Sequence, residues 1–147
     1  KPKYHHHVIG GNFRLDPLQA AILLVKLPYL DSQHEKRRAN AAYYDTHLSD
    51  SYIKPYVTDG NEMIYNQYTL RSNKRDIVID RLTNFGIGSA IYYPVPLHLQ
   101  ACFSHLGYQE GDCPEAEKAS QEVFSIPIYA ELSLDERAYV VECLNSI

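Results

Sequence analysis

The sequence predicts an α/β fold in which helices cover a small sheet. Segments with helical periodicity alternate along the chain with short segments rich in β-branched and aromatic residues, and this order is typical of α/β sandwiches. The chain has 147 residues, of which 45% are hydrophobic and 22% are charged, so it is long enough to bury a core.

The first helix is predicted to begin at Pro17. Asp16 is a preferred N-cap residue, and proline suits the first helical position. Leu18, Ile22 and Val25 then recur at helical spacing. This pattern predicts a well-buried amphipathic helix.

Pro28 is expected to interrupt that helix. Because proline lacks a backbone donor, a kink or break is predicted near Leu27. Helical character resumes over residues 29–48, and the basic run at 36–38 is expected to point outward into solvent. A long, bent helix of this kind is expected to link two substructures.

The downstream elements complete the alternation of helices and strands. They are predicted strands at 64–71 and 89–93, helices at 74–85 and 114–124, an extended piece at 125–129, and a last helix from Ser133. The extended piece is placed at a sheet edge because it contains Pro127. Ser133 and Glu136 have the spacing of a capping box.

Composition excludes several classes of function. The net charge of −4 gives no case for a nucleic-acid partner. The cysteines at 102, 113 and 143 are odd in number and lack the spacing of metal ligands, which predicts a reducing cytoplasm. No apolar run is long enough to cross a bilayer, so no membrane partner is expected either.

The segment before the first helix combines two glycines with polar side chains. Gly10 and Gly11 form a flexible turn, and Asn12 and Arg14 then present an amide and a guanidinium just before a helix N-terminus. Such a loop suits an anion, for example a phosphate or carboxylate. The alternative is an ordinary loop-to-helix junction in which Arg14 forms a salt bridge, and the local pattern alone favours it.

Two other groups of residues invite catalytic interpretations that the pattern does not favour. The histidines at 5–7 could ligate a metal, but adjacent extended residues point to opposite faces and no nearby residue completes a ligand set. Lys26 has apolar neighbours, as Schiff-base lysines often do, yet its stem can carry the amine to solvent. We therefore predict neither a metal site nor a catalytic nucleophile in this chain.

A second candidate site follows the strand predicted at 89–93. Tyr92, Tyr93 and His98 stand on a segment stiffened by Pro94 and Pro96, which can hold hydrogen-bonding groups in fixed positions for a polar substrate such as a sugar. Alternatively, the tyrosines pack at the end of the sheet and His98 caps the following short helix. The pattern leaves both interpretations open.

Taken in order, these segments resemble the C-terminal part of the DegT/DnrJ/EryC1/StrS aminotransferases, over essentially the whole chain. The motifs that carry the resemblance are Gly11-Asn12-Phe13-Arg14-Leu15-Asp16, Leu18-Gln19-Ala20-Ala21-Ile22-Leu23, Lys26-Leu27 with Leu30, Lys36-Arg37-Arg38, Gly86-Ile87-Gly88, Tyr93-Pro94-Val95-Pro96-Leu97-His98 and Ser125-Ile126-Pro127-Ile128-Tyr129.

The resemblance implies the aspartate-aminotransferase-like (type I) fold. Residues 1–30 would form the end of the large domain that binds pyridoxal phosphate and the start of the linking helix, and residues 31–147 the C-terminal small domain. The family's members are homodimers that use pyridoxal 5'-phosphate to aminate nucleotide-linked keto sugars. We accordingly expect glutamate as the amino donor and a role in the biosynthesis of surface polysaccharide or other sugars.

The resemblance also implies residue roles. Asn12 would reach the cofactor phosphate of the partner subunit, and Arg14 would lie near the substrate end of the same pocket. Tyr92, Tyr93 and His98 would belong to the sugar-nucleotide cleft, although many members carry histidine where this chain has Tyr92. The sequence of this loop also resembles that of members that act on UDP-linked 3-keto uronic acids.

The family's Schiff-base lysine would lie upstream of Lys1, and since Lys1 is not a methionine, a longer protein is expected. Without that lysine the chain has no covalent anchor for the cofactor, so we expect it to be inert alone. The alternative is a non-catalytic module of the same fold that binds a sugar nucleotide or mediates dimerisation.

Overall fold

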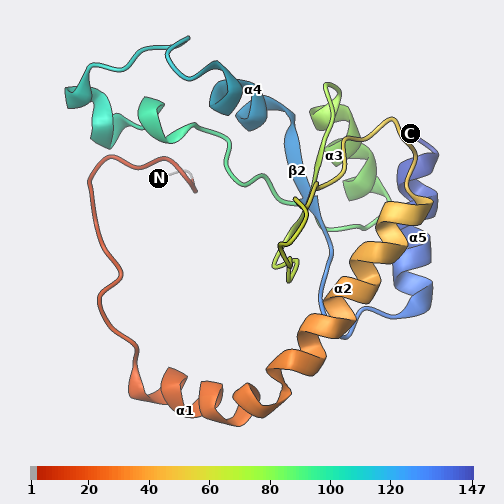
Figure 1. Ribbon diagram of the computed structural model, residues 1–147. Helices are drawn as coiled ribbons and strands as arrows, with labels where there is room; N and C mark the ends of the chain where they lie inside the picture. Colours follow the sequence, from red (N-terminus) through yellow and green to blue (C-terminus); the bar gives the residue numbers. More distant parts are fainter. Residues whose placement is uncertain (1–2) are drawn as a thin grey trace.

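The computed structural model describes residues 3–147 and contains an α/β body from which a helical arm extends (Figure 1). In chain order the elements are α1 (Pro17–Lys26), the 3₁₀ turn η1 (Leu27–Tyr29), α2 (Leu30–His47), β1 (Tyr68–Arg71), α3 (Arg75–Asn84), the 3₁₀ turns η2 (Leu97–Leu99) and η3 (Ala101–Leu106), α4 (Pro114–Glu122), β2 (Val123–Ile126) and α5 (Leu134–Asn145).

The sheet is small and antiparallel. Strands β1 and β2 pair with Leu70 opposite Phe124, and single bridges widen the sheet on both sides, from Ile53 to β1 and from Ala90 to β2. The strand predicted at 89–93 is therefore wrong in extent, because it pairs only at Ala90. Pro94 follows closely, and proline both lacks a ladder donor and restricts the residue before it.

Two further strand predictions need correction. The strand predicted at 64–71 begins only at Tyr68, because Tyr65 adopts a positive φ of 50° that breaks the extended backbone. The piece predicted at a sheet edge is also placed differently. Ser125 bonds to neighbours on both sides, and Pro127 ends β2 instead of marking an edge.

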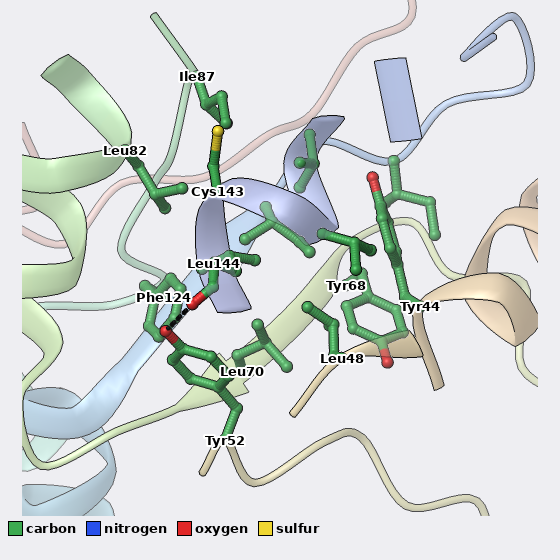
Figure 2. Close-up of a cluster of buried hydrophobic side chains, with 14 of the residues drawn as sticks. Tyr44, Leu48, Tyr52, Tyr68, Leu70, Leu82, Ile87, Phe124, Cys143 and Leu144 are labelled. Atoms are coloured by element: carbon green, nitrogen blue, oxygen red, sulfur yellow. Dashed lines mark hydrogen bonds between the residues drawn. The ribbon is translucent and has the colours of Figure 1, made fainter. Parts of the chain in front are cut away.

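The core lies between the sheet and helices α2, α3 and α5 (Figure 2). Its largest fully buried side chains are Tyr44, Tyr68, Phe124, Leu70, Leu82, Leu144 and Val78. Buried phenols in it have partners, since a buried hydroxyl without one is costly. Tyr52 Oη donates to the Leu144 carbonyl oxygen at 2.9 Å, the contact dashed in Figure 2. Tyr44 Oη donates to the Pro127 carbonyl oxygen at 2.8 Å, and burial raises the pKa of Tyr44.

The basic run on α2 does not point uniformly outward, contrary to the prediction. Lys36 is exposed, but Arg37 Nη1 donates to the Ile128 carbonyl oxygen at 2.8 Å and to that of Tyr65 at 3.3 Å. Arg38 forms an ion pair with Glu62 at 3.0 Å. These arginines hold distant loops against α2, because a guanidinium can reach several carbonyl oxygens at once.

The helical arm, which consists of α1 and η1, begins and ends as predicted, but it is not buried. The Asp16 side chain accepts from Leu18 N at 2.8 Å and caps α1, and the turn η1 at Pro28 separates α1 from α2. No residue of α1 is buried, however, and Leu24 is 70% exposed. The predicted burial is wrong for this chain because the arm extends away from the sheet and nothing within residues 3–147 covers its apolar stripe (Figure 1).

Candidate functional site

The tyrosine–proline loop, residues 92–98, leaves the sheet directly after the bridge at Ala90. It ends in the 3₁₀ turn η2, which contains His98. The Tyr92–Tyr93 peptide bond is cis, and Tyr93 is 57% exposed. The last sheet contact thus fixes the position from which both phenol rings project.

The two tyrosines form an aromatic cluster with a residue from the other end of the sequence. The Tyr4 ring meets the Tyr93 ring edge-on at 5.1 Å between centroids and the Tyr92 ring at 5.9 Å. The Tyr92 and Tyr93 rings are 5.7 Å apart and also nearly perpendicular. Edge-to-face contacts of this kind are favourable, so the chain start packs on the loop.

A hollow of about 290 Å³ lies beside this cluster. Its walls include Tyr92 and Ser89, together with the exposed amides of Asn66 and Gln67. No sequence pattern marks these two amides as functional, since they precede β1 in a segment predicted to be strand. Their side chains supply donors and acceptors next to the loop that was predicted to bind a polar substrate.

His98 is held within the fold instead of being left free. Its Nε2 lies 2.9 Å from Glu117 Oε1, and the two side chains are only 10% and 14% exposed. The same carboxylate accepts the backbone N–H groups of Gly111 and Cys113. The Gly111 N–H is the largest influence that holds the pKa of Glu117 below its ordinary value, with Cys113 and His98 contributing further.

Asn12 and Arg14 lie in the exposed segment that runs from the loop region to α1 (Figure 1). Within residues 3–147 neither side chain makes a hydrogen bond or an ion pair, so the salt bridge considered for Arg14 is not formed in this chain. The N-terminus of α1 is already capped by the Asp16 carboxylate. An anion here would therefore be held by the amide and the guanidinium, with the helix end contributing less than the sequence pattern suggested.

The structure does not bring all the predicted site residues together. Tyr92 and Tyr93 touch each other, His98 lies further along the same loop, and no hydrogen bond or aromatic contact in the described part of the chain joins them to Asn12 or Arg14. The link between the two groups is the segment that carries Tyr4 and His6.

The remaining candidates stay outside any site. Among the described residues no group of histidines, cysteines and carboxylates could hold a metal ion. Lys26 is exposed on α1. Cys102, Cys113 and Cys143 are free thiols. None of the described helices has the length and apolar character needed to span a membrane.

Comparison with known proteins gives consistent matches. The model of the DegT/DnrJ/EryC1/StrS aminotransferase family matches residues 1–145. The "pleiotropic regulatory protein" of Geobacillus stearothermophilus is 49% identical over 146 residues, covering 97% of this chain and 39% of that protein. The UDP-N-acetyl-3-dehydro-alpha-D-glucosamine 3-aminotransferase of Acidithiobacillus ferrooxidans is 38% identical over 143 residues, covering 97% of this chain and 38% of that enzyme.

A solved structure agrees with these sequence matches. S. venezuelae DesV resembles this chain with a TM-score of 0.86 at 32% identity, over 99% of this chain and 40% of that one. The chain thus spans about 40% of the length of these relatives.

Proposed function

The chain belongs to the DegT/DnrJ/EryC1/StrS aminotransferase family, and we propose that the complete protein transfers an amino group to a nucleotide-linked keto sugar. The family match over residues 1–145 carries the proposal. The A. ferrooxidans relative acts, by its name, on a UDP-linked 3-keto amino sugar. We propose that glutamate is the amino donor and that the product is used in the biosynthesis of surface polysaccharide or other sugars. Because the cysteines are free thiols, we also propose that the protein is located in the cytoplasm.

The residues present fit the phosphate of pyridoxal 5'-phosphate, the cofactor that the family implies. Asn12 and Arg14 are exposed, make no hydrogen bond within residues 3–147 and are separated by one residue, Phe13. An amide donor and a guanidinium suit a phosphate and a second anion nearby. When bound, pyridoxal phosphate supplies the electron sink for moving an amino group.

We assign the binding roles to this chain as follows. Asn12 donates its amide to the cofactor phosphate of a partner subunit, and Arg14 pairs with an anionic group of the substrate. Tyr92 and Tyr93 contact the nucleotide sugar beside the hollow at the sheet end. His98 contributes through the loop, because its Nε2 is already engaged by Glu117.

The domain boundary near residue 30 is part of the same proposal. The buried side chains run from Asn40 to Leu144, whereas α1 has none. We therefore assign residues 1–30 to the large domain and residues 31–147 to the small one. The exposed apolar stripe of α1 supports the proposal that this helix is buried by the rest of the complete protein and by a homodimeric partner.

The test uses the complete protein and the 147-residue chain side by side. The complete protein, supplied with pyridoxal phosphate and glutamate, is expected to aminate a member of a panel of nucleotide-linked 3-keto and 4-keto sugars that includes uronic acids, detected by mass spectrometry. The isolated chain is expected to show neither bound-cofactor absorbance nor turnover. Failure of the complete protein on the whole panel, or turnover by the isolated chain, would contradict the proposal.

A second candidate function is a non-catalytic binding or dimerisation module. The observation that favours it is the name of the G. stearothermophilus relative, which describes a regulatory protein. The sequence upstream separates the two functions, because a catalytic protein requires the Schiff-base lysine there. Binding of a nucleotide sugar without transfer of an amino group, together with loss of that lysine, would support the module.

A further inference from the structure

Gln100 stands between the turns η2 and η3 and is 5% exposed. Its Oε1 accepts the backbone N–H of His6 at 2.9 Å, and its Nε2 donates to the Tyr4 carbonyl oxygen at 2.8 Å. A longer contact of 3.5 Å joins Nε2 to the carbonyl oxygen of Val95 in the tyrosine–proline loop. One buried amide thus bonds the chain start and the loop at the same time.

Two other contacts reinforce this attachment. The Cys102 N–H donates to the His6 carbonyl oxygen at 3.1 Å, so His6 is bonded through both of its backbone groups. The Tyr4 ring packs edge-on against the rings of Tyr92 and Tyr93. The segment from Tyr4 to His6 is therefore seated on the loop by hydrogen bonds and by aromatic packing.

The attachment sets where the next residues can lie. Residues 7–15 are exposed, and the following fixed point is the Asp16 cap of α1. The stretch from His6 to Asn12 can extend to at most ~20 Å. Asn12 and Arg14 must therefore lie within reach of two attachment points, the bonds of His6 to Gln100 and the start of α1.

We infer that Gln100 is a positioning residue that seats the chain start on the tyrosine–proline loop and so couples the loop to Asn12 and Arg14. The inference rests on the proposed function for the roles of those two residues and deepens it. Substrate contacts at Tyr92 and Tyr93 and anion contacts at Asn12 and Arg14 are then made by one connected unit of this chain.

The test compares Gln100→Leu with a matched variant in the complete protein. Asn145 provides the match, because its amide also joins a distant backbone segment: Oδ1 accepts from Ser49 N at 2.8 Å and Nδ2 donates to the His47 carbonyl oxygen at 2.9 Å. Asn145→Leu therefore removes two bonds of the same type, made here by an exposed side chain, at a place far from the loop in the sequence.

Amide hydrogen exchange is the primary measurement. In Gln100→Leu the amides of His6 and Cys102 are expected to exchange roughly fivefold to tenfold faster, as follows from the loss of one ordinary hydrogen bond. In Asn145→Leu the amide of Ser49 is expected to exchange faster, and those of His6 and Cys102 are expected to be unchanged. His6→Pro removes the bonded N–H from the exposed side without touching the core. If Gln100→Leu fails to fold, faster exchange at the Cys102 amide is expected in His6→Pro instead.

Kinetics supply the second measurement. Gln100→Leu is expected to raise both the KM for the nucleotide sugar and the dissociation constant of pyridoxal phosphate severalfold, with a smaller change in kcat, whereas Asn145→Leu lowers thermal stability alone. Unchanged exchange at His6 and Cys102, or equal kinetic effects of both variants, overturns the inference. If the parent protein aminates no keto sugar, the proposed function fails, while the exchange data still decide whether Gln100 seats the chain start.

Discussion

At the scale of single residues, tyrosine side chains serve at least two different purposes in this chain. The chain has thirteen tyrosines. Tyr44 and Tyr52 are buried, and each hydroxyl donates to a carbonyl oxygen of a distant segment. Tyr92 and Tyr93 pack through their ring edges on a loop, and burial of Tyr93 is incomplete. A phenol serves both purposes because it has an apolar body and a polar tip.

Arg14 and Asn12 offer a test at this scale. In the complete protein, Arg14→Ala is expected to raise the KM for the nucleotide sugar by roughly tenfold or more, since a charge-assisted contact contributes about 1.5–3 kcal/mol. Retention of pyridoxal phosphate changes little, and Asn12→Ala gives the opposite pattern. Steady-state kinetics and cofactor titration measure the two effects. Equal losses in both variants would show that the two side chains do not have separate roles.

Single residues also show why part of the site escaped prediction. Asp16 and Pro17 act within their own helix, so their roles could be predicted from neighbours alone. Gln100 acts on residues more than ninety positions away, and Arg37 likewise reaches Ile128. A buried glutamine or a half-buried arginine of this kind has no local pattern, because its partners are backbone groups that any residue could supply.

At the scale of elements, capping and proline signals were predicted correctly, whereas strand bounds were not, and the helix predicted at 114–124 ends at Glu122, where β2 begins. The break at Pro28 and the capping box of Ser133 and Glu136 are confirmed. The extent of the strand predicted at 89–93 is wrong, since strand extent depends on partners that lie far away in the sequence. The predicted α/β class is nevertheless correct, because it depends on the order of the elements and not on their bounds.

The contact of α4 with η2 gives a prediction for pH. Glu117 on α4 has a pKa held below its ordinary value, chiefly by the Gly111 N–H. A carboxyl whose pKa is lower in the folded state stabilises the fold above its unfolded pKa, and this contribution is lost as the pH falls through the folded value. In Glu117→Gln the free energy of unfolding is therefore expected to vary less across the acidic range, measured by urea unfolding at several pH values.

Glu136→Gln is the matched control, because Glu136 also accepts a backbone N–H, that of Ser133, and its pKa is also lowered mainly by that bond. Both variants should reduce the acidic dependence. Only Glu117→Gln should speed hydrogen exchange at the amides of Gly111 and Cys113. Unaltered exchange at these two amides would mean that Glu117 does not hold the loop before α4 in place.

At the scale of the whole molecule, the chain consists of a body with a core and an arm without one. The core side chains contact one another across α2, the sheet, α3 and α5, and the arm contributes none of them (Figures 1 and 2). The apolar residues of α1 and η1 line a hollow of about 560 Å³ that includes Leu23, Leu24 and Leu27. Apolar surface of this extent favours association when water is its only neighbour.

The isolated 147-residue chain is therefore expected to self-associate through the arm. Sedimentation should show oligomers that grow with concentration, whereas residues 31–147 stay monomeric and unfold cooperatively in urea. Their free energy of unfolding is expected to lie about 1–3 kcal/mol below that of the longer chain, because the exposed arm contributes little to stability but the Gln100 amide loses its bonds to Tyr4 and His6. Leu24→Asp in the longer chain should reduce association, since Leu24 is 70% exposed and the new charge resists burial. A monomeric 147-residue chain, or residues 31–147 that do not unfold cooperatively, would contradict the division into body and arm.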